Sequence, residues 1–147
     1  MLLRASIGRM FGFGIAFATV IGCSSKNPDR TLNETEDRLF TFGKAYIQAS
    51  AQLKRGPKDF SEIKSFLPSD ATHDVLLSPN DGEEFVILWG VDFNKLPPGA
   101  DPFYVGAYEK KGRDGKRYVL RFPIGVVTMT DEELRSAAFP PGHKPPL

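Results

Sequence analysis

Reactive metal-binding residues are scarce in this 147-residue chain, which contains one cysteine and two histidines. A single cysteine, Cys23, excludes an intramolecular disulfide. A zinc site needs three or four ligands, usually Cys and His, and His73 lies far from His143 in the sequence. The chain also has no Gly-x-Ser-x-Gly motif to place a nucleophilic serine. We therefore predict no metal centre built on these histidines, no catalytic residues, and a protein that is not an enzyme.

The chain also lacks a large charge of either sign. It has 19 Lys and Arg against 18 Asp and Glu, for a formal net charge of +1. Binding to nucleic acid depends on a basic excess that neutralises phosphates, so the composition excludes a nucleic-acid partner. Hydrophobic residues make up 41% of the chain and charged residues 25%, which is typical of a single globular domain.

The apolar run at residues 10–21 is too short to span a membrane, because a transmembrane helix needs roughly 20 apolar residues. Arg4 and Arg9 precede the run, and no acidic residue occurs before Asp29. A basic start followed by a short apolar run and a small residue is typical of a secretory signal. We predict that residues 1–22 are a removable signal peptide.

The end of this run, Val20-Ile21-Gly22-Cys23, resembles the lipobox of bacterial lipoproteins. The resemblance implies that the Cys23 thiol is diacylglycerylated, that a peptidase cuts before Cys23, and that palmitate-type chains anchor the protein in a membrane. Two or more acyl chains anchor stably, at about 0.8 kcal/mol per buried CH₂. The expected location is lipid-anchored to a bacterial cell membrane, facing the periplasm or the cell exterior. Plain secretion and a retained membrane helix are the alternatives.

Four segments are expected in the chain. Residues 1–22 are the signal peptide, residues 23–31 the lipidated cysteine with a flexible polar tether, residues 32–138 a single α+β domain, and residues 139–147 a proline-rich tail without core-forming residues.

A long helix is predicted over residues 33–55. Apolar residues recur there every three or four positions, as on one face of a helix: Leu39, Phe42, Tyr46, Ala49 and Leu53. Phe40 lies beside this stripe and is expected to widen the buried face. Capping residues at Thr31 or Asn33 fit the start, and Gly56-Pro57 fits the end. A shorter helix is predicted at residues 60–67.

After residue 74 the pattern changes to strands, predicted at residues 84–90, 103–109, 116–122 and 125–130. Tight turns at residues 112–115 and 123–125 favour an antiparallel meander. Within 116–122, one face of the strand is expected to be exposed to solvent and the other buried. The two faces are formed by alternating residues: Arg117, Val119 and Arg121 on one, and Tyr118, Leu120 and Phe122 on the other. A short helix is predicted at residues 131–138. The fold class is α+β, with the long helix packed on a small antiparallel sheet.

The helix with aromatic residues in its stripe, the Gly56-Pro57 corner and the run at residues 77–85 before the strands resemble the soluble domain of type II secretion major pseudopilins. That resemblance implies a helix-plus-sheet fold and a loop-bound calcium ion. The chain departs from pseudopilins at the N-terminus: Gly12-Phe13 is followed by Phe17 where the family has Glu, and the apolar run ends at Cys23. It is therefore not expected to polymerise through that helix.

A cluster of oxygen-bearing residues, Asn80, Asp81 and Glu83, is the candidate calcium site, since Ca²⁺ takes six to eight oxygen ligands. Pro79-Asn80-Asp81-Gly82 is also a common turn sequence, and the turn is the preferred interpretation.

The sequence predicts a membrane-tethered cell-envelope lipoprotein that acts as a non-enzymatic structural or protein-interaction domain, pseudopilin-like in its fold. Its expected partners are the membrane, through the lipid anchor, and another envelope protein. The alternative is a small-molecule- or calcium-binding accessory lipoprotein of an envelope machine.

Overall fold

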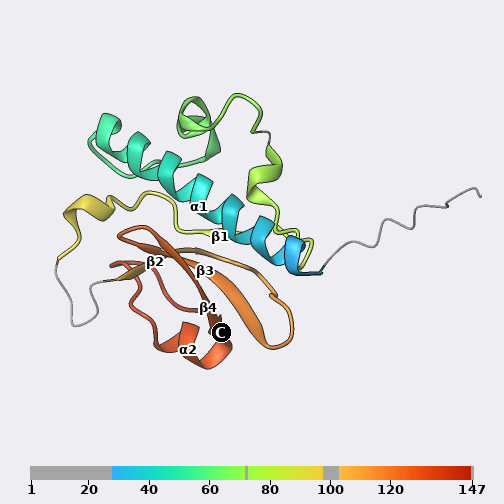
Figure 1. Cartoon of the computed structure of the whole chain (residues 1–147). Helices are drawn as coiled ribbons and strands as arrows, with labels where there is room; N and C mark the ends of the chain where they lie inside the picture. Colours follow the sequence, from blue (N-terminus) through green and yellow to red (C-terminus); the bar gives the residue numbers. More distant parts are fainter. Residues whose placement is uncertain (1–27, 72, 98–102, 147) are drawn as a thin grey trace, which may run out of the picture.

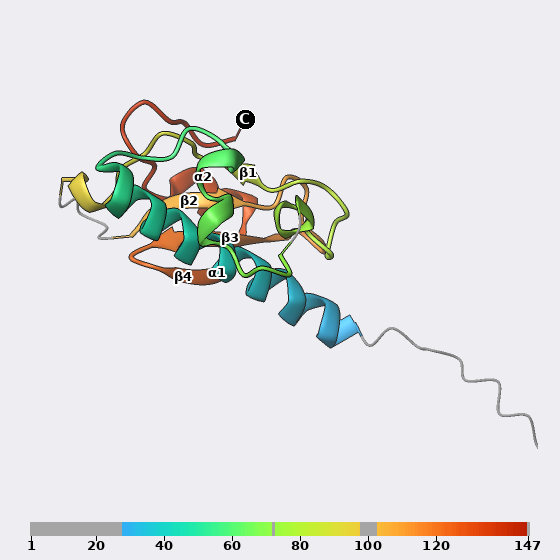
Figure 2. The same cartoon turned by 90° about the horizontal axis from the view of Figure 1, so that it is seen from above.

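The computed structural model describes residues 28–71, 73–97 and 103–146 and shows an α+β fold. Helix α1 (Pro28–Leu53) lies on one face of a four-stranded antiparallel sheet of order β1-β2-β3-β4, and the short helix α2 (Asp131–Ser136) lies on the other face (Figures 1 and 2). The predicted fold class is confirmed. Within the described part of the chain, no helix has the length and apolar character needed to cross a membrane.

Helix α1 begins and ends earlier than the sequence predicted. It starts at Pro28, a residue that suits the first helical position because its fixed φ is helical and its missing N–H has no partner there. The predicted caps at Thr31 and Asn33 are therefore wrong, since both residues lie inside the helix. The helix ends at Leu53 because Lys54 adopts a left-handed conformation with φ 59°.

The buried face of α1 follows the predicted stripe over most of its length. Leu39, Phe42, Tyr46 and Ala49 are buried against the sheet. Leu53 is 37% exposed, because the helix ends at that residue.

The prediction that Phe40 widens the buried face is wrong. Phe40 is 36% exposed, and the Lys44 ammonium group lies 4.4 Å from the centre of its ring. A cation over an aromatic face is a favourable surface contact, which accounts for an exposed Phe at this position.

The predicted helix at residues 60–67 is instead two 3₁₀ turns, η1 (Phe60–Glu62) and η2 (Lys64–Phe66). Asp59 caps the first turn by accepting a hydrogen bond from the Ser61 N–H. The buried side chain of Ile63, between the two turns, fixes the segment against α1. A third turn, η3 (His73–Leu76), follows.

Strands β2 (Tyr104–Tyr108), β3 (Lys116–Phe122) and β4 (Gly125–Thr130) match the predicted segments closely. Strand β1 (Val86–Ile87) is much shorter than the predicted 84–90, because the chain turns away at Gly90, whose N–H donates to the Pro57 carbonyl at 2.6 Å.

Register shifts by one residue at Gly106, where the pairing of β2 with β3 is interrupted. A Cβ at this position would lie 2.2 Å from the Phe122 ring, so only glycine fits. The irregularity lets the Phe122 ring cover the strand.

The middle of β3 is buried on both faces, which corrects the prediction that one face of this strand is exposed to solvent. Leu120 packs with α1 on one side, whereas Val119, on the opposite side, is 0% exposed and packs with Leu134 of α2. A second apolar cluster therefore lies between the sheet and the C-terminal segment.

The predicted proline-rich tail also contributes to this second cluster. The ring of Phe139 lies 6.3 Å from that of Tyr108, and Pro140 is fully buried. The Ala138 carbonyl accepts a hydrogen bond from the Val105 N–H at 2.9 Å. The prediction that residues 139–147 contribute nothing to the core is therefore wrong for Phe139 and Pro140.

Removing one hydroxyl from the core tests how α1 is joined to the sheet. Tyr46 donates to the Leu88 carbonyl at 3.0 Å and accepts from the Val91 N–H at 3.1 Å, and burial raises the pKa of Tyr46 to about 12. Tyr46→Phe leaves these backbone groups unpaired, so we expect a loss of about 2 kcal/mol in the free energy of unfolding, measured by urea denaturation. Tyr104→Phe, which removes an exposed hydroxyl bond, is the control and should cost less than half as much.

Candidate functional site

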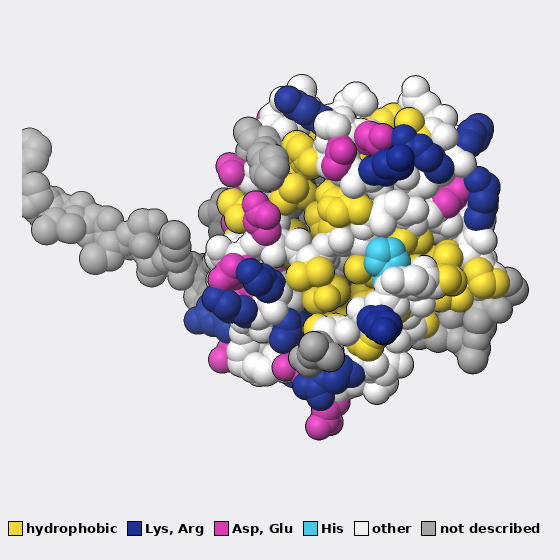
Figure 3. Space-filling model, turned by 180° about the vertical axis from the view of Figure 1, so that it is seen from behind, with side chains coloured by type: hydrophobic (Ala, Val, Ile, Leu, Met, Phe, Trp, Pro, Cys, Tyr) yellow, Lys and Arg dark blue, Asp and Glu magenta, His cyan; other side chains and the backbone are white. Residues whose placement is uncertain are grey.

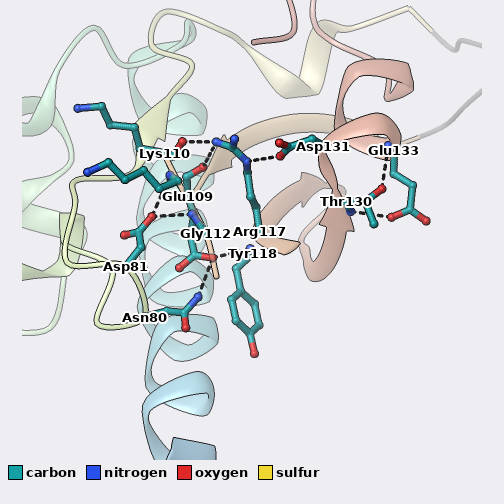
Figure 4. Close-up of polar contacts among 11 residues, drawn as sticks. Asn80, Asp81, Glu109, Lys110, Gly112, Arg117, Tyr118, Thr130, Asp131 and Glu133 are labelled. Atoms are coloured by element: carbon teal, nitrogen blue, oxygen red, sulfur yellow. Dashed lines mark hydrogen bonds and ion pairs between the residues drawn. The ribbon is translucent and has the colours of Figure 1, made fainter. Parts of the chain in front are cut away.

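The three candidate calcium ligands belong to the loop before β1. Two of them, Asn80 and Asp81, lie next to the hairpin that joins β2 to β3 (Figure 4). Asp81 is the residue that joins the two segments. One carboxylate oxygen accepts the backbone N–H groups of Lys111 at 3.0 Å and Gly112 at 2.9 Å. The other oxygen accepts the Glu83 N–H at 3.0 Å. Asp81 thus holds the hairpin turn against its own loop.

Glu83 is turned toward cations of the same hairpin. Its carboxylate pairs with Lys110 at 3.4 Å and, more closely, with Lys111. The two lysine side chains lower the pKa of Glu83. Because Lys and Glu are largely exposed here, the pairs contribute little to stability.

This geometry fits the turn interpretation better than a calcium site. The oxygens of Asp81 already accept three backbone N–H groups, and Glu83 already pairs with cations. Across the residues that the structure describes, no group of three or more His, Cys, Asp and Glu side chains is placed to hold a metal ion.

A buried carboxylate, Glu109, lies at the centre of the same cluster and was missed by the sequence analysis. It is 0% exposed at the end of β2. One of its oxygens accepts the Ser78 hydroxyl at 2.5 Å, and the other accepts the Tyr118 N–H at 2.8 Å and the Asn80 amide at 3.2 Å. All three partners are donors, as a carboxylate requires. Nothing in the local pattern of residues 103–109 signals a buried acid, because two of the donors come from a loop some 30 residues earlier.

Arg117 joins this cluster to α2. Its Nε donates to the Asp131 carboxylate at 2.7 Å, and its Nη1 donates to the carbonyls of Glu109 and Lys110 (Figure 4). On either side of Asp131 in the chain, the side chains of Thr130 and Glu133 form a capping box at the start of α2. The cluster therefore holds the hairpin, β3 and α2 in a fixed arrangement.

A surface cavity of about 290 Å³ opens beside Asn80 and the hairpin. The residues that line it, besides Asn80, are Arg113, Asp114, Lys116, Arg117, Tyr118 and Thr128. The side-chain oxygen of Asn80, Oδ1, is buried and has no hydrogen-bond partner within the described structure. The volume is at the lower end of the range for small-molecule sites.

A larger and more open cavity of about 400 Å³ lies between α1 and η3. Four acidic residues line it: Glu34, Asp37, Asp70 and Asp74. Among the described residues that line it, the cation is Arg38, which donates to the carbonyls of Asp74 and Leu77 and pairs with Glu34, so it joins the loop to the helix. A solvated acidic face accounts for this cavity.

Of the two histidines and the cysteine weighed from the sequence, only His143 has a described side chain. Figure 3 shows a histidine on the back of the molecule, among hydrophobic side chains. His143 belongs to the C-terminal segment, where its N–H donates to the Pro140 carbonyl. The side chain of His73 and all of Cys23 lie outside the described residues, as does the whole predicted signal peptide. Lipidation of Cys23 thus stays a prediction.

No protein-family model matches the chain, and comparisons with curated proteins and with solved structures found no significant match. The geometry of the cluster and the sequence of the N-terminal segment are therefore the basis for any functional proposal. The resemblance to pseudopilins stays a prediction from the sequence pattern.

The hydrogen bonds of Asp81 predict that the fold becomes less stable in acid. Burial raises the pKa of Asp81, but the N–H groups of Glu83, Gly112 and Lys111 outweigh it and hold this pKa below its usual value. An acid whose pKa is lowered by folding stabilises the fold at pH values above its ordinary pKa, which is near 3.9 for Asp. This contribution is lost as the pH falls through the folded-state pKa. We expect Asp81→Asn to cost about 1–2 kcal/mol at pH 7 and progressively less as the pH falls below about 3.9.

Urea denaturation of both proteins between pH 7 and pH 2 measures this difference. Asp70→Asn, at an exposed position, is the matched control and should leave the pH profile unchanged. A constant gap between wild type and Asp81→Asn at every pH would contradict the assignment.

Proposed function

We propose that this protein is a lipid-anchored component of the bacterial cell envelope. The observation that carries the proposal is the lipobox-like Val20-Ile21-Gly22-Cys23, placed directly after an apolar run too short to cross a membrane. Helix α1 begins at Pro28, so four residues separate the modified cysteine from the first helical residue. At about 3.3–3.6 Å per residue, this connection spans less than about 20 Å. The domain would be held close to the membrane surface.

The domain acts by binding and not by catalysis in this proposal. The buried carboxylate of Glu109 accepts three hydrogen bonds, and Asp81 also accepts three, so both acids serve to hold the fold. The partner is another protein of the envelope, and the helix-first order of elements supports a pseudopilin-like role without polymerisation.

Mass spectrometry of the native protein tests the anchor. The proposal expects a mature chain that begins at Cys23 and carries diacylglycerol on the sulfur and an acyl chain on the new N-terminus. An intact leader, or an unmodified thiol at position 23, would overturn it.

A pulldown from detergent-solubilised envelope tests the partner. The lipidated protein is compared with a Cys23→Ala variant, which lacks the anchor but keeps the described domain. A defined envelope protein enriched with wild type, and cross-linked to the domain, supports the interaction role. Turnover of esters, peptides or glycans that a point variant abolishes would contradict it.

A second candidate function, binding of a small molecule, is favoured by the cavity beside Asn80. Calcium is less well supported, because Asp81 and Glu83 already have partners. A thermal shift of several degrees with calcium chloride, abolished in Asp81→Ala, would favour calcium.

A further inference from the structure

We propose that the cavity beside Asn80 binds a small anion that also carries a hydroxyl group, such as a hydroxylated carboxylate or a sugar phosphate. This inference deepens the small-molecule function proposed above and rests on it. A site for such a ligand needs cations at one end, a hydrogen-bond acceptor and a cavity of suitable size. The described residues supply all three.

The cationic end consists of Arg113 and Lys116. Both are exposed on the β2–β3 hairpin, and neither has an ion pair with any carboxylate that the structure describes. Arg117, by contrast, is already held by Asp131. Of the described residues that line the cavity, Asp114 alone is acidic, so the lining is positive. A guanidinium group beside an ammonium group suits a carboxylate or a phosphate.

The acceptor is the side-chain oxygen of Asn80, Oδ1. The side-chain nitrogen, Nδ2, donates to the Glu109 carboxylate at 3.2 Å. If the amide group were rotated by 180°, its oxygen would face a carboxylate oxygen, which is unfavourable. Glu109 therefore fixes the direction of the Asn80 oxygen, which is buried and has no partner among the described residues. An unpaired buried acceptor is costly, and a ligand hydroxyl would satisfy it.

Tyr118 completes the polar lining. Figure 4 shows its hydroxyl and the Asn80 carbonyl oxygen pointing the same way, away from the Glu109 carboxylate, and both residues line the cavity. Burial first, and then the charges of Glu36 and Glu109, raise the pKa of Tyr118, so its hydroxyl keeps its proton at neutral pH. It can therefore donate to a ligand oxygen.

The two ends together define the ligand class. A simple anion would pair with Arg113 and Lys116 but leave the Asn80 oxygen unpaired. A neutral sugar would pair with Asn80 but not with the cations. A molecule with both groups satisfies both ends, and the volume of about 290 Å³ restricts it to a small one.

Isothermal titration calorimetry on the full, processed protein in detergent tests the proposal. The probes are sodium gluconate, glucose 6-phosphate, acetate, inorganic phosphate and glucose. We expect gluconate or glucose 6-phosphate to bind at least about tenfold more tightly than the three simple probes. Gluconate binding would identify a carboxylate ligand, and glucose 6-phosphate binding a phosphate ligand. Equal binding of inorganic phosphate, or no binding of either hydroxylated anion, would overturn the proposal.

Two variants locate the site. Tyr118→Phe removes only the hydroxyl, and the double variant Arg113→Gln with Lys116→Gln removes the cations; each should weaken binding about tenfold or more. The matched control, Lys64→Gln with Lys144→Gln, removes two exposed cations elsewhere and should leave affinity unchanged.

Binding that neither site variant weakens would also overturn the proposal. Mass spectrometry of the same sample reads the lipid on Cys23 independently, so failure of ligand binding is distinguishable from failure of the anchor. Thermal unfolding of each variant confirms that the fold is retained.

Discussion

Replacing Cys23 with serine is expected to abolish lipid attachment and to remove the protein from the stably anchored membrane fraction. The lipobox resemblance implies that the Cys23 thiol takes the lipid and that cleavage occurs before this residue, and we expect that a serine hydroxyl does not replace the thiol in either step. The uncut leader would leave an apolar segment of residues 10–21, which is too short for a stable span. Loss of two or more acyl chains removes the contribution of every buried CH₂, about 0.8 kcal/mol each.

Metabolic labelling with an alkyne fatty acid, followed by extraction of membranes at alkaline pH, measures this effect. Wild type should be labelled and resist extraction, and Cys23→Ser should be unlabelled, extractable and larger by the mass of the leader. Ser24→Ala is the matched control, since it changes the neighbouring residue and leaves the thiol. Equal labelling of Cys23→Ser and wild type would contradict the anchor.

A further variant distinguishes the role of the lipid in anchoring from the role of the leader in export. Replacement of residues 1–22 by an ordinary cleavable signal, with serine at position 23, should give a soluble exported domain. The apolar clusters of the described domain are formed by residues between Leu39 and Phe139, so this exchange leaves the core intact. Retention of that protein in the membrane would show that a protein partner, and not lipid, provides the attachment.

Local sequence signals predicted the elements whose formation depends on neighbouring residues. Strands β3 and β4 have the predicted bounds, because β-branched and aromatic residues alternate there between tight turns. The turn between β2 and β3 was predicted from Gly112 and Gly115, and both have positive φ, at 69° and 72°. The stripe of α1 was predicted from its spacing in the same way.

Features that depend on distant contacts were not predictable from these signals. Val119 was assigned to a solvent-exposed face because it lies on the same face of the strand as Arg117 and Arg121. In the structure, Leu134 and Phe139 pack in the cluster that covers it. Periodicity shows that a strand has two different faces but does not show what packs on each. The short 3₁₀ turns at residues 60–66 were called one helix, since the apolar spacing of three residues fits both forms.

The candidate site shows the same division. The oxygen-bearing cluster Asn80, Asp81 and Glu83 was identified from the sequence as a turn with calcium as the alternative, and the turn explains its contacts. Glu109 and the cavity beside it gave no signal, because Ser78 and Tyr118 reach the carboxylate from opposite directions along the chain. A buried acid is recognisable only when its donors are known.

Glu109→Ala is expected to be among the most destabilising single substitutions in the described domain. It leaves the buried Tyr118 N–H without an acceptor, frees Asn80 and Ser78, and opens a cavity at the end of β2. Breaking a buried hydrogen-bond network and leaving a cavity of this kind costs about 3–5 kcal/mol. For a domain of this size the melting temperature should fall on the order of 10–20 °C.

Calorimetry of wild type, Glu109→Ala and Glu109→Gln measures the effect. Glu109→Gln keeps one oxygen for the Tyr118 N–H but turns an amide donor toward Asn80 or Ser78, so its loss should be roughly half as large. Glu84→Ala, which replaces an exposed acid two residues before β1, is the control and should change stability by less than about 0.5 kcal/mol. If Glu109→Ala costs no more than Glu84→Ala, the carboxylate does not hold the hairpin, and the fixed orientation of Asn80 inferred from it fails as well.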